Sequence, residues 1–278
     1  MQNSELELLP GKQLFFASDF HLGLGSREES LAREKRVVAW LREIAPSAGA
    51  IFLMGDLFDY WYEFRKVVPA GFVRFLGTIA QITDQGIPVY FFPGNHDLWA
   101  FRYLEEEVGM QIIRQGIFTH LYGVPFYLGH GDGLGAAEKQ YRIMKACFSS
   151  PTLQWLFSKI HPDWNLTLGQ TWSKHSRLAK GVYTPFMGRE KEFQITFAEK
   201  SLQTHFSRFF VMGHRHLPMD VHLANDSRLI GLGEWIHACT YAVFDGQEMT
   251  LQTYQTEYPV PIYREGLLYP SDGGAQPV

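Results

Sequence analysis

An α/β fold with helices on the faces of its sheet is predicted for this chain. Short and nearly unbroken apolar runs alternate with segments of helical periodicity, a pattern typical of strands that are buried on both faces. The chain has 278 residues, of which 46% are hydrophobic, so it can bury a core without stabilising disulfides. We expect buried strands at 13–18, 50–54, 88–92, 125–128 and 209–212.

Segments between these strands have the periodicity of amphipathic helices. Residues 28–43 place Leu31, Val38 and Leu41 on one stripe, opposite a basic face. After residue 209 the apolar runs become short or alternating, which favours antiparallel sheet. We therefore expect further helices at 70–85 and 98–108 and strands at 220–223, 227–232, 236–244 and 248–254, the last two joined by a hairpin turn at Asp245 and Gly246.

Residues 136–191 differ from the rest of the chain in charge and composition. They contain nine Lys and Arg against three Asp and Glu, a net charge of +6, whereas the whole chain carries −4 and the remainder therefore −10. We expect a mostly helical insertion here, between two parts of one core at 1–135 and 192–258, and a loose tail at 259–278. The insertion is rich in aromatic residues, namely Tyr141, Phe148, Trp155, Phe157, Trp164, Trp172, Tyr183 and Phe186.

Composition excludes several classes of protein. Cys147 and Cys239 are the only cysteines and neither belongs to a CxxC pair, which excludes a disulfide scaffold and a zinc finger. No run approaches the roughly 18 apolar residues of a membrane-spanning helix, and the acidic start of the chain lacks the features of a signal peptide. The negative net charge gives no reason to expect nucleic acid as a partner. We expect a cytoplasmic protein.

Groups that can bind a metal follow each of the five buried strands. Ligands of open α/β sheets bind at the carboxyl ends of the strands, so these five segments are expected to meet at one site. A single buried histidine is more often structural, but five such segments at five strand ends are improbable by chance. The segments are Asp19-Phe20-His21, Gly55-Asp56, Gly94-Asn95-His96-Asp97, Gly129-His130-Gly131-Asp132 and Gly213-His214-Arg215-His216.

Carboxylates, one amide oxygen and imidazoles make up this set of candidate ligands. The mixture suits borderline divalent ions such as manganese, iron, zinc or nickel, and does not suit calcium, which prefers oxygen ligands alone. The set is too large for one tetrahedral ion and fits two ions about 3.5–4 Å apart that share one carboxylate, for which Asp56 is the natural choice. The candidate ligands are Asp19, His21, Asp56, Asn95, His130, His214 and His216.

The blocks D-x-H, G-D, G-N-H-D, G-H and G-H-x-H, in this order over residues 14–216, resemble those of the calcineurin-like metallophosphoesterases. The resemblance implies a four-layer α/β/β/α sandwich with a dinuclear metal site at the strand ends. It implies that His96 is the catalytic histidine, which donates to a phosphoryl oxygen or to the leaving group, and that Asp97 orients it. It also implies one metal held by Asp19, His21, Asp56 and His216 and a second held by Asp56, Asn95, His130 and His214, with Asn95 beside the substrate.

Within this family the chain resembles the branch that hydrolyses UDP-2,3-diacylglucosamine, a lipid-linked nucleotide sugar, in lipid A biosynthesis. The similarity lies in DFHL at 19–22, GDLFDYW at 55–61, HGD at 130–132 and the insertion that follows, while GNHD at 94–97 departs from the GNRD of that branch. The resemblance implies two divalent ions, manganese foremost, and release of UMP and 2,3-diacylglucosamine 1-phosphate. Another phosphoesterase of the family, acting on cyclic nucleotides, phosphoproteins or other phosphodiesters, and a non-catalytic binding module remain alternatives.

The basic and aromatic insertion favours an anionic amphiphile as substrate, with the insertion as a lid in peripheral contact with the anionic inner-membrane surface. Lys174, Arg177 and Lys180 recur at helical spacing and can share one face that binds the substrate's phosphates. A solvated basic face, and rings that only pack against the core, are the alternatives. The rings that can close a groove for acyl chains are Trp155, Phe157, Trp164 and Trp172.

Overall fold

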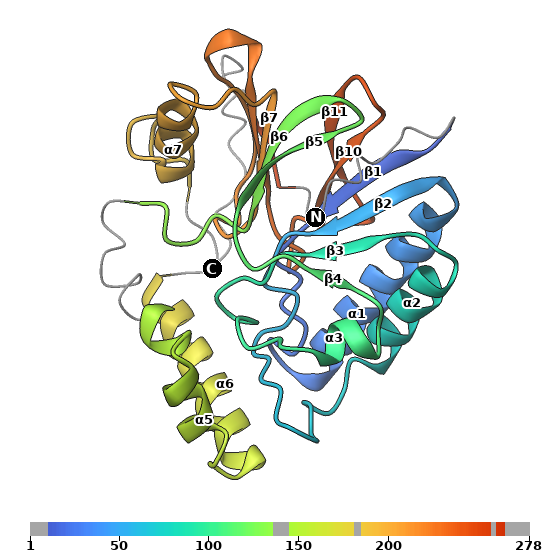
Figure 1. Ribbon diagram of the computed structural model, residues 1–278, viewed down its shortest axis with the longest axis vertical. Coiled ribbons are helices and arrows are strands. Elements are labelled where there is room, and N and C mark those ends of the chain that lie inside the picture. Colours follow the sequence, from blue (N-terminus) through green and yellow to red (C-terminus); the bar gives the residue numbers. More distant parts are fainter. Residues whose placement is uncertain (1–10, 136–144, 181–184, 257–259, 265–278) are drawn as a thin grey trace, which may run out of the picture.

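The computed structural model describes residues 11–135, 145–180, 185–256 and 260–264, and in these residues two six-stranded sheets face each other (Figure 1). The first sheet has the strand order β11 (Met249–Thr253), β10 (Thr240–Phe244), β1 (Gln13–Ala17), β2 (Ala48–Leu53), β3 (Val89–Phe91) and β4 (Gln111–Ile112). The second has the order β12 (Tyr263–Arg264), β8 (Pro218–His222), β9 (Arg228–Leu232), β7 (Phe209–Met212), β6 (Val124–Gly129) and β5 (Ile117–Leu121). Strands β1 to β4 are parallel to one another, as are β6, β7 and β9, so their carboxyl ends lie on the same side.

Helices cover the outer faces of both sheets. Successive residues of a strand point to opposite faces, and in β1 Phe16 packs between the sheets while Phe15 faces the helices. The helices α1 (Arg27–Ile44) and α2 (Val73–Asp84) cover the first sheet, and α7 (Phe193–Ser201) covers the second (Figure 1). The molecule is therefore a four-layer α/β/β/α sandwich, as predicted.

The helix predicted at 98–108 is wrong over most of its length, because α3 spans only Tyr103–Glu106. The carboxylate of Glu63 accepts hydrogen bonds from the backbone N–H groups of Arg102 and Tyr103, at 2.7 and 3.0 Å. These bonds satisfy N–H groups that a helix end leaves unpaired and fix the start of the helix at this point. The other two predicted helices are present, with ends shifted by one to three residues.

Each predicted strand is present, and the hairpin turn between β10 and β11 at Asp245 and Gly246 is confirmed. The strand predicted at 236–244 begins only at Thr240, because the buried carboxylate of Glu234 accepts the N–H groups of the preceding residues and holds them in a turn.

Three short strands, β4, β5 and β12, were not expected from the sequence. For β5 a signal was available, since Tyr122 and Gly123, both at positive φ, form the turn of a hairpin between alternating segments. Strand β12 lies in the stretch 259–278 for which a loose tail was predicted, and pairs with β8. The rest of that stretch lies outside the described residues, apart from 260–262.

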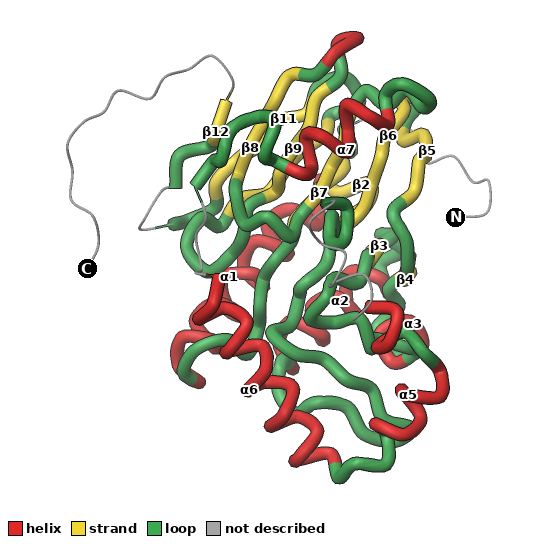
Figure 2. Tube along the Cα trace, turned by 90° about the vertical axis from the view of Figure 1, so that its left-hand side faces the viewer, coloured by secondary structure: helices red, strands yellow, loops and turns green. Residues whose placement is uncertain are grey.

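Helices dominate the described part of residues 136–191, the stretch predicted to be an insertion. They include α5 (Pro151–Phe157) and α6 (Pro162–Lys180), which lie beyond the carboxyl ends of the strands of the first sheet (Figures 1 and 2). Residues 136–144 and 181–184 lie outside the described residues. Among the helices of the described residues, none is both long and apolar enough to span a bilayer.

Candidate active site

Loops at the carboxyl ends of strands from both sheets meet at one place and are joined by hydrogen bonds. The N–H of Asp19 donates to the carbonyl of Gly55 at 2.9 Å, and the N–H of His21 donates to the carbonyl of Asp56 at 3.0 Å. The N–H of His214, from the loop after β7, donates to Oδ2 of Asp19 at 2.9 Å. These bonds join three of the five predicted segments, the first two through main-chain groups and the third through the carboxylate of Asp19.

Most of the predicted ligands occupy left-handed backbone conformations, with φ between 45° and 66°. Such a conformation costs a residue other than glycine roughly 1–3 kcal/mol and persists only where the surrounding structure enforces it. Strained positions of this kind cluster at functional sites. The ligands concerned are Asp19, His21, Asp56, His214 and His216.

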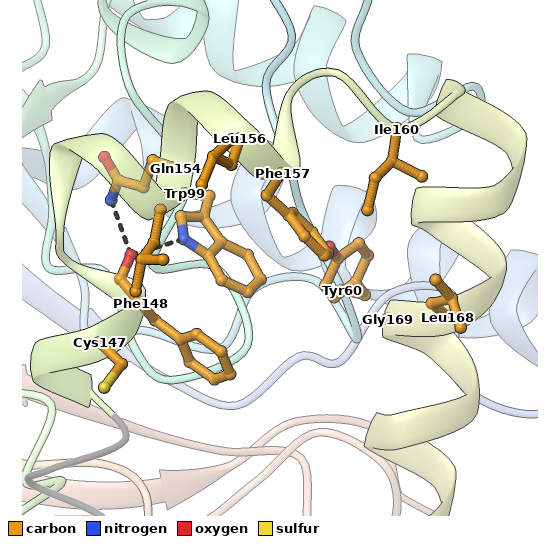
Figure 3. Close-up of a pocket in the computed structure, with 11 residues that line it drawn as sticks. Tyr60, Trp99, Cys147, Phe148, Gln154, Leu156, Phe157, Ile160, Leu168 and Gly169 are labelled. Atoms are coloured by element: carbon orange, nitrogen blue, oxygen red, sulfur yellow. Dashed lines mark hydrogen bonds between the residues drawn. The ribbon is translucent and has the colours of Figure 1, made fainter.

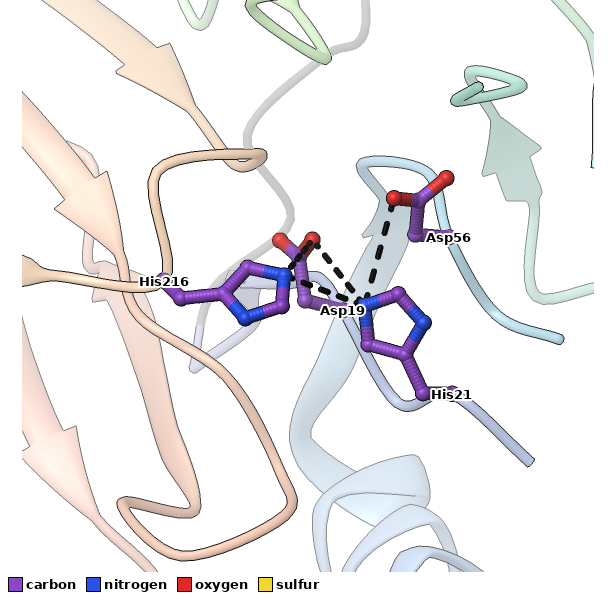
Figure 4. Close-up of side chains that lie close together, drawn as sticks. All are labelled: Asp19, His21, Asp56 and His216. Carbon is purple, nitrogen blue, oxygen red and sulfur yellow. Dashed lines mark hydrogen bonds and ion pairs between the residues drawn. The ribbon is translucent and has the colours of Figure 1, made fainter. Parts of the chain in front are cut away.

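The first predicted metal group is assembled as the sequence suggests. One ligand atom from each of its four residues lies within 4.8 Å of the others (Figure 4). The Nε2 atoms of His21 and His216 are 3.0 Å apart, and Oδ1 of Asp19 is 3.1 Å from Nε2 of His216. Oδ2 of Asp56 is 3.9 Å from Nε2 of His21. These atoms converge on a common point that a cation can occupy.

A second group shares Asp56 with the first and adds His130 and His214, with ligand atoms again within 4.8 Å of one another. Nε2 of His130 is 3.4 Å from Oδ2 of Asp56. Nδ1 of the same ring lies 2.7 Å from the carbonyl of Met54, so Nδ1 carries the proton and Nε2 is left as a ligand.

Two glycines leave the space that these ligands need. A Cβ atom on Gly55 would lie 2.3 Å from Nδ1 of His130, and φ of this glycine is +93°. A Cβ atom on Gly94 would lie 2.2 Å from Oδ1 of Asp56 and 2.7 Å from Nε2 of His130. Any other residue at either position would displace a predicted ligand.

Eight buried side-chain N or O atoms of the described residues have no hydrogen-bond partner, and three of them are Oδ1 of Asp19, Oδ1 of Asn95 and Nε2 of His130. Buried polar atoms are normally paired, and an orphaned one calls for an ion or a water. All three belong to predicted ligands, including the amide oxygen of Asn95. The donor set therefore fits the divalent ions that the sequence implies, while coordination by each residue stays a prediction.

The carboxylates and histidines of the site shift one another's pKa values. Burial opposes ionisation of Asp56, but the neighbouring His130 and His96 outweigh burial and hold the pKa of Asp56 well below its ordinary value. Burial also acts to lower the pKa of His130, but the Asp56 carboxylate raises it to about 10. The pKa of His216 is raised in the same way by Asp19. His130 and His216 therefore favour the protonated form, and a bound metal must displace those protons.

His96, the predicted catalytic histidine, lies at the edge of the site and is only partly buried. Its N–H donates to Oδ1 of Asp56 at 2.9 Å, and its ring packs edge-on against His21 with centroids 5.0 Å apart. Nδ1 lies 2.7 Å from the carbonyl of Asp59. Nε2 is therefore the ring nitrogen available to a substrate.

The orienting contact of His96 thus comes from the Asp59 main chain, where the sequence suggested Asp97. The buried carboxylate of Asp97 instead accepts backbone N–H groups of Gly94 at 2.7 Å and Leu57 at 2.6 Å. Burial and the charge of Asp56 raise the pKa of Asp97 to about 7. Asp97 acts on the site by tying together the loops after β2 and β3.

An apolar pocket of about 570 Å³ lies between the insertion and the loops after β2 and β3 (Figure 3). Tyr60 and Trp99 form its wall on the core side, and Phe148, Leu156 and other residues of the insertion form the opposite wall. Of the rings predicted to close a groove, Phe157 lines this pocket, whereas Trp155 and Trp164 are 59% and 71% exposed. The side chains of Trp172, Lys174, Arg177 and Lys180, all in α6, lie outside the described residues.

The sequence profile of the calcineurin-like phosphoesterases matches residues 13–228, which run from β1 to the start of β9 and include α5 and α6. The chain belongs to the calcineurin-like phosphoesterase family. It is accordingly a metal-dependent phosphoesterase, and the resemblance inferred from the spaced blocks is confirmed.

Two similar proteins of this phosphoesterase family are named UDP-2,3-diacylglucosamine hydrolase. That of Porphyromonas gingivalis W83 is 36% identical over 87% of this chain and 98% of its own length. That of Nitrosococcus oceani is 29% identical over 80% of this chain and 86% of its own length. Among solved structures, the phosphoesterase Yfce of E. coli is 14% identical over 87% of this chain and 92% of its own, with a TM-score of 0.43.

Proposed function

We propose that this phosphoesterase hydrolyses the pyrophosphate bond of UDP-2,3-diacylglucosamine, with water as nucleophile, to UMP and 2,3-diacylglucosamine 1-phosphate. The apolar pocket carries the proposal. Its lining includes Tyr60, four residues after Asp56 in the same loop. A small phosphodiester would leave this apolar volume of about 570 Å³ unfilled. An acyl chain can fill it, and each buried methylene then contributes about 0.8 kcal/mol to binding. The name carried by the two relatives supports the same substrate.

Metal binding and proton donation in this reaction are assigned to different residues of the chain. Asp19, His21, Asp56 and His216 would hold one divalent ion, and Asp56, Asn95, His130 and His214 a second. When bound, such ions activate water and neutralise charge on the phosphate. His96 presents Nε2 toward the substrate because Nδ1 is held by the carbonyl of Asp59, so a protonated Nε2 can donate to a phosphoryl oxygen or to the leaving group.

Manganese is the proposed metal on the strength of the family resemblance, and the carboxylate and amide oxygens of the ligand set are ligands that suit it. The proposed partners are the lipid-linked nucleotide sugar and an anionic membrane surface. We place the protein in the cytoplasm, at the inner membrane, where its lipid substrate resides. Exposed Leu153, Trp155, Trp164 and Leu168 on α5 and α6 suit interfacial contact. The net charge of −10 outside the insertion opposes a nucleic-acid track.

The decisive experiment is manganese-dependent hydrolysis of UDP-2,3-diacylglucosamine in detergent micelles, with release of UMP as readout. A generic aryl phosphodiester is assayed in parallel. Fast release of UMP supports the proposal. Turnover of the aryl diester without release of UMP would agree with phosphoesterase activity but would overturn the proposed lipid substrate. Another phosphodiester would then be the substrate.

A pocket variant tests the role of the apolar pocket in the same assay. Leu168→Glu places a charge on the pocket wall at a side chain that is 57% exposed, so folding is preserved. We expect the KM for the lipid to rise at least 10-fold while turnover of the aryl diester is unchanged. Val73→Glu, at an apolar and still more exposed position of α2 (74%) outside the pocket, is the matched control and should alter neither activity. Equal effects of the two variants would argue against the pocket.

A further inference from the structure

Asp59 lies between the insertion and the active site and contacts both. It is buried, three residues after Asp56 in the loop that follows β2. Its carboxylate Oδ1 is 3.1 Å from Oγ of Ser173 in α6 and 3.9 Å from Nδ1 of His21. Its carbonyl oxygen is 2.7 Å from Nδ1 of His96. One residue thus contacts the insertion, a predicted metal ligand and the catalytic histidine.

The hydroxyl of Ser173 completes a small hydrogen-bond network at this point. Nδ1 of His96 donates its proton to the Asp59 carbonyl and has Oγ of Ser173 within 3.3 Å. Ser173 in turn donates to the Asp59 carboxylate. Because Ser173 is buried, no bulk water competes for these bonds.

The face of α6 that carries Ser173 is fitted closely to the same loop. Gly169 and Asn165 lie one and two turns earlier on this face. A Cβ atom on Gly169 would lie 2.2 Å from the ring of Tyr60, and the hydroxyl of Tyr60 donates to Oδ1 of Asn165 at 2.9 Å. The contact of Ser173 with Asp59 therefore depends on how α6 is seated.

The Asp59 carboxylate also lies beside the ring of His21. Oδ1 of Asp59 is 3.9 Å from Nδ1 of His21, so the two groups are in electrostatic contact without a hydrogen bond. Nδ1 of His21 faces Asp59, and Nε2 faces Asp19 and Asp56. This arrangement suits a ligand that uses Nε2.

We propose that Asp59 is a positioning residue whose carboxylate acts on His21 and which, together with Ser173, ties the seating of α6 to the orientation of His96. The insertion then does more than line a lipid pocket, because its docking completes the active site itself. This inference rests on the metal-dependent phosphoesterase activity proposed above and is independent of the lipid substrate.

Manganese titration calorimetry of the metal-stripped protein and turnover of an aryl phosphodiester at saturating manganese test the proposal together. For Asp59→Asn we expect manganese binding to weaken about 10- to 100-fold, the usual effect of removing such a partner. For Ser173→Ala we expect kcat to fall about 10-fold, with manganese affinity within about threefold of wild type. Because Ser173 and Asp59 belong to one hydrogen-bond network, the loss of kcat in the double variant should be smaller than the product of the two single losses.

Tyr62→Phe is the matched control, since it removes another hydrogen bond between this loop and the insertion, to the carbonyl of Gln154, without contact to His21 or His96. Both its manganese affinity and its kcat should match wild type. Unchanged manganese affinity in Asp59→Asn, or a loss in Tyr62→Phe as large as that in Ser173→Ala, would overturn the proposal. Failure of the lipid assay would leave the manganese titrations intact, so the two proposals fail separately.

Discussion

The loops at the strand ends that carry the predicted metal ligands (the metal-ligand loops) and the insertion differ in what their side chains contact. Asp19 and His21 are fully buried, and their neighbours are other charged groups and main-chain amides. On α5 and α6, by contrast, Trp155 and Trp164 are 59% and 71% exposed, and apolar side chains line an open pocket. The first region therefore has its contacts within the chain, whereas the second presents surface that nothing in the described chain covers.

The difference separates two functions that one active site has to combine. Ligands held in left-handed backbone and anchored by main-chain hydrogen bonds are preorganised for charge, which suits a reaction common to a whole family. An exposed apolar surface can bind the apolar part of one substrate and so distinguish it from other substrates. We expect substitutions in the loops to affect all substrates alike and substitutions in the insertion to discriminate among them.

Asp56→Ala should have the largest effect, because this carboxylate belongs to both ligand groups. We expect aryl diester turnover to fall at least 1,000-fold and manganese content to fall at both sites, with the loss of Coulomb attraction between Asp56 and His130 as an added cost. Metal content by mass spectrometry and turnover under saturating manganese measure the effect. An active variant with full metal content would refute the shared role of Asp56.

Gly94→Ala should have the next largest effect, since the added Cβ would overlap Oδ1 of Asp56 and Nε2 of His130. We expect kcat to fall roughly 10- to 100-fold, as is usual for misplaced ligands. Gly77→Ala is the matched control, because a Cβ atom there meets nothing within 4 Å in α2. That control should gain about 0.5–1 kcal/mol in the free energy of unfolding. Equal losses of kcat in the two variants would contradict the requirement for a glycine beside the predicted ligands.

Stability of the metal-free protein should fall as pH rises. The pKa of His130 in the folded chain is about 10, above its ordinary value of 6.5, so its contribution is complete below pH 6.5 and is lost as pH rises through 10. The raised pKa of Asp97, about 7, acts in the same direction from pH 3.8 upward.

We expect the Tm of the metal-free protein to fall by about 5 °C or more between pH 6.5 and 9. Calorimetry of metal-stripped and manganese-loaded samples measures this, and the loaded sample should show a flatter profile because metal replaces the proton. A metal-free Tm that is constant or rises over this interval would contradict the charge pairing in the metal-ligand loops.

The smallest effect on stability is expected in the insertion. Trp155→Gln combined with Trp164→Gln changes two exposed rings, so the free energy of unfolding should stay within about 0.5 kcal/mol of wild type. Binding to vesicles of anionic phospholipid should weaken at least fivefold in a flotation assay. Phe206→Gln, at an exposed ring outside the insertion, should bind as wild type does. Equal binding by all three proteins would remove the proposed membrane contact.

The sequence by itself determined the α/β class and the composition of the site, and its resemblance to a family implied the four-layer sandwich. Buried parallel strands produce unbroken apolar runs, and the topology of open sheets brings the residues after each run together, so the Asp19, Asp56 and His214 segments could be predicted to meet. Local periodicity also located most helices. These features depend on chemistry and spacing along the chain, which a sequence displays directly.

Only the tertiary structure decided the contacts made by single carboxylates. Glu63 shortens α3, Glu234 delays β10, Asp97 ties two loops together, and the Asp59 carboxylate holds Ser173 of α6. Glu63, Asp97 and Asp59 each reach a partner 39 or more residues away along the chain, whereas the partners of Glu234 lie within four residues. A buried carboxylate accepts hydrogen bonds from whichever donors the packed fold brings within about 3 Å. No periodic pattern in the sequence indicates which donors these are.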